Sequence, residues 1–170
     1  MKRLFLVGGP MGVGKSTVCK QLIKKLQPGV YLDGDWCWNM SPFSVTDETK
    51  AMVMDNICAL LGRFLACPEL VDNVVFGWVM HQQEIMDTIC ARLPLEGVTV
   101  YRVSLLASPK VLRDRVVRDI ARGVRDGEAI SRSMAYLPLY EKLDTWKIDT
   151  DHCTPGQAAA QILRLLEQQG

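Results

Sequence analysis

The chain has 170 residues, of which 48% are hydrophobic and 23% charged, and its formal net charge at pH 7 is +1. This length fits one domain with a real core and excludes two separate cores joined by a linker. The near-neutral charge disfavours non-specific binding to DNA, and no apolar stretch approaches the about 20 residues that span a bilayer, so we expect a cytoplasmic protein without membrane contact.

Short apolar runs alternate with longer amphipathic segments, which is typical of β-α units around a parallel sheet. The predicted strands, in chain order, cover residues 4–7, 30–33, 74–79, 98–106 and 145–148. The predicted helices cover residues 15–26, 47–66 and 82–92, a segment that begins at Pro109, and residues 130–140 and 155–168. The sequence therefore predicts a three-layer α/β fold with a five-stranded parallel sheet, in a single domain over residues 1–170.

Several residues mark where these elements begin and end. Thr46 is a predicted N-cap with acidic residues at 47–48 in the first helical turn, and residues 67–68 (Cys-Pro) are predicted to end that helix. Residues 108–109 (Ser-Pro) combine a cap with a proline at the first helical position. Residues 121–132 contain two glycines among charges, which predicts a mobile loop or lid.

The first chemical motif is the glycine-rich turn at residues 9–16, whose sequence GPMGVGKS fits G-x-x-x-x-G-K-[ST]. In such a P-loop, backbone N–H groups and the N-terminus of the next helix face phosphate oxygens. Lys15 is expected to contact the β and γ phosphates, and the Ser16 hydroxyl to bind Mg²⁺. A glycine-rich turn with an incidental lysine is the alternative, but the position between a strand and a helix favours the P-loop. The predicted cofactors are ATP and Mg²⁺, and the predicted nucleotide-binding residues are Gly9, Met11, Gly12, Val13, Gly14, Lys15, Ser16 and Thr17.

Two aspartates, Asp33 and Asp35, end the second predicted strand. Strand side chains repeat every two residues, so both carboxylates face the same way while the chain stays extended. Ligands of open parallel sheets bind at the carboxyl ends of the strands, which places this pair beside the P-loop. We expect Asp33 to serve Mg²⁺ and Asp35 to accept the proton of an attacking hydroxyl, and the sequence also allows the reverse assignment. The alternative is a simple turn, because Asp and Gly are common turn residues.

With these motifs the chain resembles the small P-loop kinases of the nucleoside-monophosphate-kinase-like group. This group includes shikimate kinase, gluconate kinase, adenylylsulfate kinase and chloramphenicol phosphotransferase. Residues 32–35 (LDGD) are similar to a stretch in adenylylsulfate kinase, whereas residues 36–39 (WCWN) differ from it, and the D-G-[FY]-P-R stretch of nucleoside-monophosphate kinases is absent. The resemblance implies the strand order 2-3-1-4-5 and an adenine loop at residues 149–152, and it leaves the acceptor open.

An arginine-rich segment precedes and enters the predicted lid. Residues 102–132 hold eight basic and four acidic residues, a local charge of +4. Arg115, Arg118 and Arg122 share one helical face, and a solvated face is the alternative explanation for any single arginine. The resemblance implies that lid arginines stabilise the transferring phosphoryl group, with Arg115 and Arg118 as candidates ahead of Arg122 and Arg125.

Aromatic and polar side chains follow the second and third predicted strands at the same edge of the sheet. An acceptor pocket needs apolar walls with a few placed polar groups. The predicted acceptor-binding residues are Trp36, Trp38, Asn39 and His81. Core packing is the alternative for each tryptophan, and a local hydrogen bond for His81.

Together these features predict a Mg²⁺-dependent phosphotransferase (kinase) that moves the γ-phosphoryl group of ATP to a hydroxyl or phosphate of a small molecule, such as a nucleotide or a sugar-like metabolite. A GTPase-type switch is disfavoured, because the sequence has no N-K-x-D motif and no D-x-x-G after the third strand. A nucleotide-binding regulator without turnover, and a kinase that acts on a macromolecule such as RNA, stay as alternatives.

Overall fold

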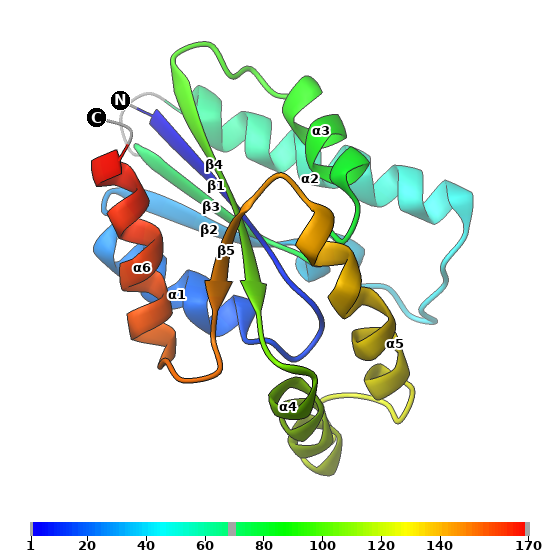
Figure 1. Ribbon diagram of the computed structural model, residues 1–170. Helices are drawn as coiled ribbons and strands as arrows, with labels where there is room; N and C mark the ends of the chain where they lie inside the picture. The colour runs from blue at the N-terminus through cyan, green and yellow to red at the C-terminus, as the bar shows by residue number, and fades with distance from the viewer. Residues whose placement is uncertain (1, 68–70, 169–170) are drawn as a thin grey trace.

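Five parallel strands form the centre of the computed structural model, which describes residues 2–67 and 71–168 (Figure 1). The strands are β1 (Lys2–Gly8), β2 (Gly29–Asp33), β3 (Asn73–Gly77), β4 (Val98–Leu106) and β5 (Trp146–Asp149). Their order in the sheet is β2-β3-β1-β4-β5, and every neighbouring pair is parallel. The predicted fold and strand order are therefore confirmed.

Helices cover both faces of this sheet. They are α1 (Lys15–Lys25), α2 (Asp47–Ala66), α3 (Gln83–Ala91), α4 (Pro109–Ala121), α5 (Ala129–Tyr136) and α6 (Pro155–Gln168), with the 3-10 helices η1 (Gly34–Trp38) and η2 (Leu137–Lys142). α1 and α6 lie side by side on one face, and α2 and α3 lie over the other (Figure 1). No helix in the described part of the chain is both long enough and apolar enough to cross a membrane.

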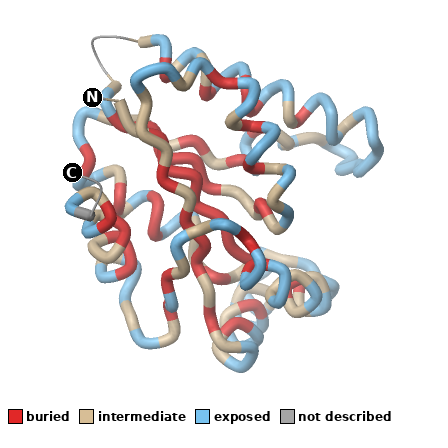
Figure 2. The backbone as a smooth tube through the Cα atoms, turned by 45° about the horizontal axis from the view of Figure 1, so that its top comes forward, coloured by how far each residue is buried: buried red, intermediate tan, exposed pale blue. Residues whose placement is uncertain are grey.

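The core has two halves, one on each face of the sheet. Phe5 and Val7 of β1 pack with α1 and α6, whereas Leu4 and Leu6 pack with α2 and α3. All four side chains are excluded from solvent, and the central strands are the most deeply buried part of the backbone (Figure 2). Side chains alternate along a strand, so a strand covered on both faces is apolar at every position. This is why β1 is a continuous apolar run in the sequence.

The structure differs from the predicted elements mainly where short helices replace extended chain or loop. Residues 34–38 form η1 directly after β2, and β3 ends at Gly77, before the predicted end at residue 79. The helix predicted over residues 130–140 is divided into α5 and η2, with Pro138 in the first turn of η2. Proline has no N–H to continue an α-helix, which accounts for the change in helix type.

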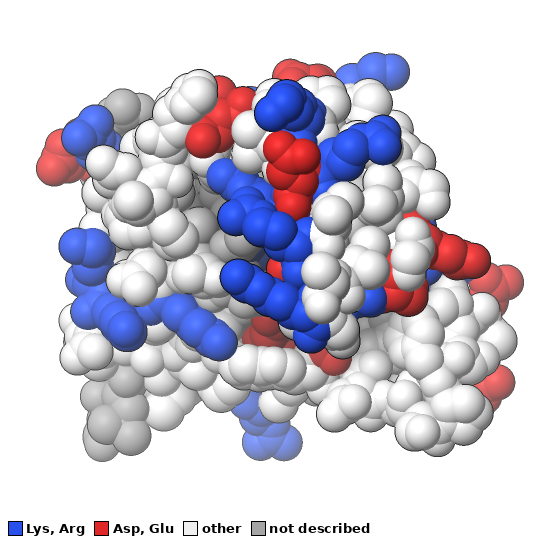
Figure 3. Space-filling model, turned by 90° about the horizontal axis from the view of Figure 1, so that it is seen from below, with Lys and Arg blue, Asp and Glu red and all other residues white. Residues whose placement is uncertain are grey.

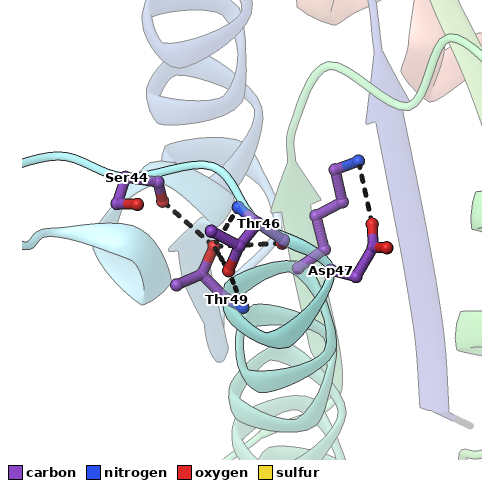
Figure 4. A network of polar contacts seen from close by, with 5 residues as sticks. Ser44, Thr46, Asp47 and Thr49 are labelled. Carbon is purple, nitrogen blue, oxygen red and sulfur yellow. Dashed lines mark hydrogen bonds and ion pairs between the residues drawn. The ribbon is translucent and has the colours of Figure 1, made fainter.

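The N-terminus of α2 is capped as predicted (Figure 4). The Thr46 hydroxyl accepts a hydrogen bond from the Thr49 N–H at 3.1 Å, and the Thr49 hydroxyl accepts one from the Thr46 N–H at 2.8 Å. Each side chain therefore satisfies a backbone donor that the helix itself leaves unpaired. At the other end, Cys67 is the C-cap, and Pro68 lies outside the described residues.

Thr46→Ala is expected to lower the free energy of unfolding by about 1 kcal/mol, because it removes the acceptor for the Thr49 N–H. Urea denaturation measures this loss as a lower midpoint at an unchanged slope. Thr46→Ser keeps the hydroxyl and serves as the matched control. Equal midpoints for the Ala and Ser variants would contradict the capping role.

Candidate active site

A cavity of about 570 Å³ lies at the carboxyl ends of the strands, between the P-loop, the start of η1 and helix α4. Its volume is in the range of small-ligand sites. The described residues that line it are Met11, Gly12, Gly14, Lys15, Ser16, Thr17, Asp33, Asp35, Trp78, Val79, Arg115, Arg118, Asp119, Arg122, Arg125 and Pro155. Most of the predicted nucleotide-binding and catalytic residues therefore meet in one cavity.

The P-loop conformation depends on glycine at two of its positions. Gly12 has φ of 85° and Gly14 has φ of 104°, values in the left-handed region that other residues rarely adopt. A Cβ atom on Gly12 would lie 2.5 Å from the Val116 side chain of α4. The two glycines thus let the loop curl, and Gly12 also lets α4 approach it closely.

The Lys15 amino group forms hydrogen bonds across the P-loop. Its Nζ donates hydrogen bonds to the carbonyl oxygens of Gly9 at 2.8 Å and Pro10 at 3.0 Å. Burial lowers the pKa of Lys15 to about 8, and the negative charge of Asp35 opposes that shift. A buried ammonium favours anions at short range, so phosphate oxygens would restore its charged form.

Asp33 joins the P-loop to β2. Its Oδ2 accepts hydrogen bonds from the hydroxyls of Ser16 and Tyr31, both at 2.8 Å. Its Oδ1 accepts one from the backbone N–H of Asp35 at 3.0 Å. A serine hydroxyl and a carboxylate side by side are the hard oxygen ligands that Mg²⁺ prefers, so the residues present fit the predicted metal.

Asp35 lines the cavity, but the backbone that places it there is not the extended strand that was predicted. The extended chain ends at Asp33 and turns into η1, so strand alternation does not place the two carboxylates. η1 passes so close to Trp78 that a Cβ on Gly34 would lie 2.3 Å from the indole. Burial of the Asp35 carboxyl raises its pKa, and the charge of Asp33 raises it further, while Lys15 opposes both effects.

The predicted lid-entry arginines differ in their contacts. Arg115 donates hydrogen bonds to the Val13 carbonyl at 3.2 Å, the Thr150 hydroxyl at 2.8 Å and the Thr150 carbonyl at 2.7 Å. It therefore ties the P-loop to the turn after β5. Arg118 contacts the carbonyl of Asp114 at 3.3 Å.

Arg125, at the turn between α4 and α5, lies near Lys15 and Asp35. Its positive charge lowers the pKa of both Lys15 and Asp35. Its Nε donates to Asp119 Oδ2 at 2.9 Å. Seen from the end of the molecule that carries α4, Lys and Arg side chains gather at the centre of the surface beside a hollow, with acidic side chains among them (Figure 3).

Comparison with known proteins places this geometry in a family. A family model described as "AAA domain" matches residues 6–132. The shikimate kinase of Pseudomonas entomophila (strain L48) is 30% identical, and the alignment covers 99% of this chain and 98% of the relative. The chain belongs to the nucleoside-monophosphate-kinase-like P-loop kinases.

Solved structures of low sequence identity share the fold of this P-loop kinase. A gluconokinase from Sinorhizobium meliloti 1021 is 20% identical with a TM-score of 0.67, and the match covers 97% of this chain and 94% of that one. The Deinococcus radiodurans tunicamycin resistance protein is 20% identical with a TM-score of 0.70, covering 98% and 96%. The shikimate kinase and the gluconokinase are small-molecule kinases by name, and the chain is an enzyme of that class.

The predicted acceptor-binding residues of the kinase lie in two places. Trp36, Trp38 and Asn39 line a second cavity, of about 490 Å³. His81 stacks on Tyr136, with ring centroids 4.0 Å apart, and is not among the described residues that line either cavity. Burial lowers the pKa of His81, which favours its neutral form.

Sequence reasoning missed several of the described residues of the P-loop kinase site, three of which make side-chain hydrogen bonds there. They are Tyr31, which donates to Asp33, Asp119, which pairs with Arg125, and Ser133 of α5, whose hydroxyl donates to the Met11 carbonyl at 2.6 Å. Tyr31 is two residues before Asp33 on the same strand, so period-two spacing was an available signal. Asp119 and Ser133 depend on how α4 and α5 pack, which no local pattern reveals.

The lowered pKa of Lys15 predicts that ATP binding takes up protons. At a pH of about 8, near the pKa of Lys15, about half of the free protein carries a neutral amine, and phosphate contact should recharge it. Calorimetric titrations of ATP in buffers of different ionisation enthalpy should then show an uptake of about 0.5 proton. Lys15→Met should abolish the uptake at this pH. Equal uptake by the variant would assign the proton to another group.

Proposed function

We propose that this P-loop kinase transfers the γ-phosphoryl group of ATP, with Mg²⁺, to a hydroxyl group of a small molecule. The observation that carries the proposal is the convergence of three chemical groups in one cavity. These are the Lys15 amino group in the P-loop, the Ser16–Asp33 pair and the Asp35 carboxylate. Each supplies a part that phosphoryl transfer needs: donor binding, metal binding and proton removal.

The donor side of the proposed reaction is the P-loop. Its backbone N–H groups and Lys15 bind the β and γ phosphates, while Ser16 and Asp33 would hold Mg²⁺ through oxygen ligands. When bound there, Mg²⁺ would neutralise part of the triphosphate charge. Tyr31 donates to Asp33 and so fixes the carboxylate that faces Ser16.

On the acceptor side, Asp35 acts as the general base. The acceptor oxygen forms a bond to the γ phosphorus as the bond from that phosphorus to the β–γ bridging oxygen breaks. The hydroxyl proton passes to the Asp35 carboxylate, and ADP leaves. A carboxylate whose pKa is raised by burial and by a neighbouring charge holds a proton better than an ordinary aspartate, which suits this role.

The arginines of α4 and the lid take different parts in the proposal. Arg118 and Arg125 face the cavity and stabilise the negative charge that spreads over the transferring group. Arg115 is a positioning residue, because its guanidinium already binds Val13 and Thr150. Of the predicted lid (residues 121–132), the turn at 122–128 between α4 and α5 closes over the phosphates and excludes water that would otherwise hydrolyse ATP.

Asp35→Asn is expected to lower acceptor-dependent ADP formation about 100- to 10,000-fold, because it removes the base. Asp33→Asn should instead raise the Mg²⁺ concentration needed for half-maximal rate. A coupled assay of ADP release, with Mg²⁺ titrated for each variant, separates the two effects. Unchanged turnover in Asp35→Asn would contradict the assignment of Asp35 as the base. If only Asp35→Asn raised the Mg²⁺ concentration needed for half-maximal rate, Asp35 would be the Mg²⁺ ligand and Asp33 the base.

Arg125→Ala is expected to lower kcat about 100-fold while ATP affinity falls much less, because the arginine acts on charge that develops during transfer. Arg113→Ala is the matched control: Arg113 is an exposed arginine of α4 and is not among the described residues lining the cavity. Steady-state kinetics at saturating ATP give the comparison. Equal losses in the two variants would point to general surface charge.

A further inference from the structure

Helix α4 ends in a motif that turns the chain back toward its own last turn. The Val124 N–H donates to the Asp119 carbonyl at 2.9 Å. The Gly123 N–H donates to the Ile120 carbonyl, also at 2.9 Å, and Gly123 has φ of 70°. These two hydrogen bonds and a left-handed glycine just past the helix form a Schellman motif. The backbone that leads to Arg125 is therefore set by the end of the helix.

The Arg125 side chain is held against this helix end by Asp119. Its Nε donates to Asp119 Oδ2 at 2.9 Å, and both side chains are 29% exposed. Of residues 122–128, all of which the structure describes, Arg125 alone is half-buried and the others are exposed. Fully exposed ion pairs hold their partners weakly, because water screens the charges. The shielding of this pair favours one fixed position for the guanidinium.

Asp119 leaves most of the guanidinium free. Of its N–H donors, only the Nε–H is bound to Asp119. Neither Nη group of Arg125 has a hydrogen-bond partner among the described residues. Asp119 and Arg125 both line the active-site cavity with Lys15 and Asp35. The remaining donors are thus available to phosphoryl oxygens while Asp119 holds the plane of the guanidinium.

A carboxylate in this wall is unfavourable unless it has a partner. The cavity is proposed to hold a triphosphate, and an unpaired carboxylate would repel it. The other acidic residues of the described lining, Asp33 and Asp35, each have a part in the proposed transfer. Asp119 takes no part in metal binding or proton removal there. Its side-chain contact is with Arg125, which points to a role that it exerts through the arginine.

Resting on the function proposed above, we propose that Asp119 is a positioning residue for phosphoryl transfer. It fixes Arg125 at the cavity before ATP binds, and the arginine keeps the same orientation to α4 after the phosphates arrive. An arginine that is already in place stabilises developing charge without first losing conformational freedom. Asp119 itself does not touch the transferring group.

Asp119→Ala tests this role through a split between rate and binding. The slow hydrolysis of ATP, with Mg²⁺ present and water as the acceptor, is followed as ADP formation and needs no identified substrate. We expect kcat to fall about tenfold, because Arg125 loses its fixed position. The Kd of adenylyl imidodiphosphate, a non-hydrolysable ATP analogue, should not rise, because the wall loses a negative charge. An unchanged kcat, or a Kd that rises about tenfold as kcat falls, would overturn the proposal.

Two matched variants serve as controls. In Asp119→Asn the amide oxygen still accepts from Nε, so kcat should lie between the values of Asp119→Ala and the wild type. Asp114 is an exposed acidic residue of the same helix, pairs with Lys110 at 3.5 Å, and is not among the described residues that line the cavity. Asp114→Ala should leave kcat unchanged. Equal losses in Asp114→Ala and Asp119→Ala would overturn the proposal.

A double-mutant cycle assigns the effect to the arginine. If Asp119 acts through Arg125, adding Asp119→Ala to Arg125→Ala should lower kcat by less than about twofold more. A further loss of about tenfold would mean that Asp119 acts by another route and would overturn the proposal. Thermal melting of the single and double variants confirms that each of them folds.

The NMR signal of the Arg125 Nε–H separates this proposal from the kinase function. The signal, assigned by its absence from Arg125→Lys, should exchange slowly with water and persist when adenylyl imidodiphosphate binds. It should be lost in Asp119→Ala. A signal that survives Asp119→Ala, or that disappears when the analogue binds, would overturn the proposal whether or not ADP forms. A signal that depends on Asp119, in a wild type that forms no ADP with water or any small molecule tested, supports the fixed arginine and contradicts the kinase function.

Discussion

The hydrogen bond from the Ser16 hydroxyl to Asp33 is the contact on which the rest of the site depends. It joins the start of α1 to the end of β2 across the intervening strand β3. In register, Gly77 of β3 lies between Val7 and Asp33. A Cβ on Gly77 would lie 3.0 Å from Cys19 Sγ of α1, so the absent side chain lets α1 come close enough for the contact.

Two cavities share η1, a cationic one and an uncharged one. The cationic cavity combines the P-loop with the arginines of α4 and the turn after it. Basic side chains gather beside a hollow in the view of Figure 3. The uncharged cavity lies between η1 and α2. η1 separates the two and carries a proposed base at its start and two tryptophans behind it.

Local sequence patterns were sufficient to predict most of the strands and helices and the P-loop. The apolar run of β1, the P-loop and the caps at Thr46 and Ser108 each follow from chemistry within a few residues, and the structure confirms them. Predictions from these local patterns were wrong where the chain leaves regular strands and α-helices. η1 replaces the extended chain expected after Asp33, because the Asp33 carboxylate caps the turn by accepting from the Asp35 N–H.

The sequence by itself determined the fold class, the phosphate-binding loop and the family, because these depend on spacing along the chain. Tertiary structure decided which side chains meet. Arg115 contacts Thr150, and Arg125 lies near Lys15 and Asp35. His81 lies outside the described lining of both cavities. Those outcomes depend on how α4 and α5 pack against the sheet, and long-range packing leaves no periodic signal in the sequence.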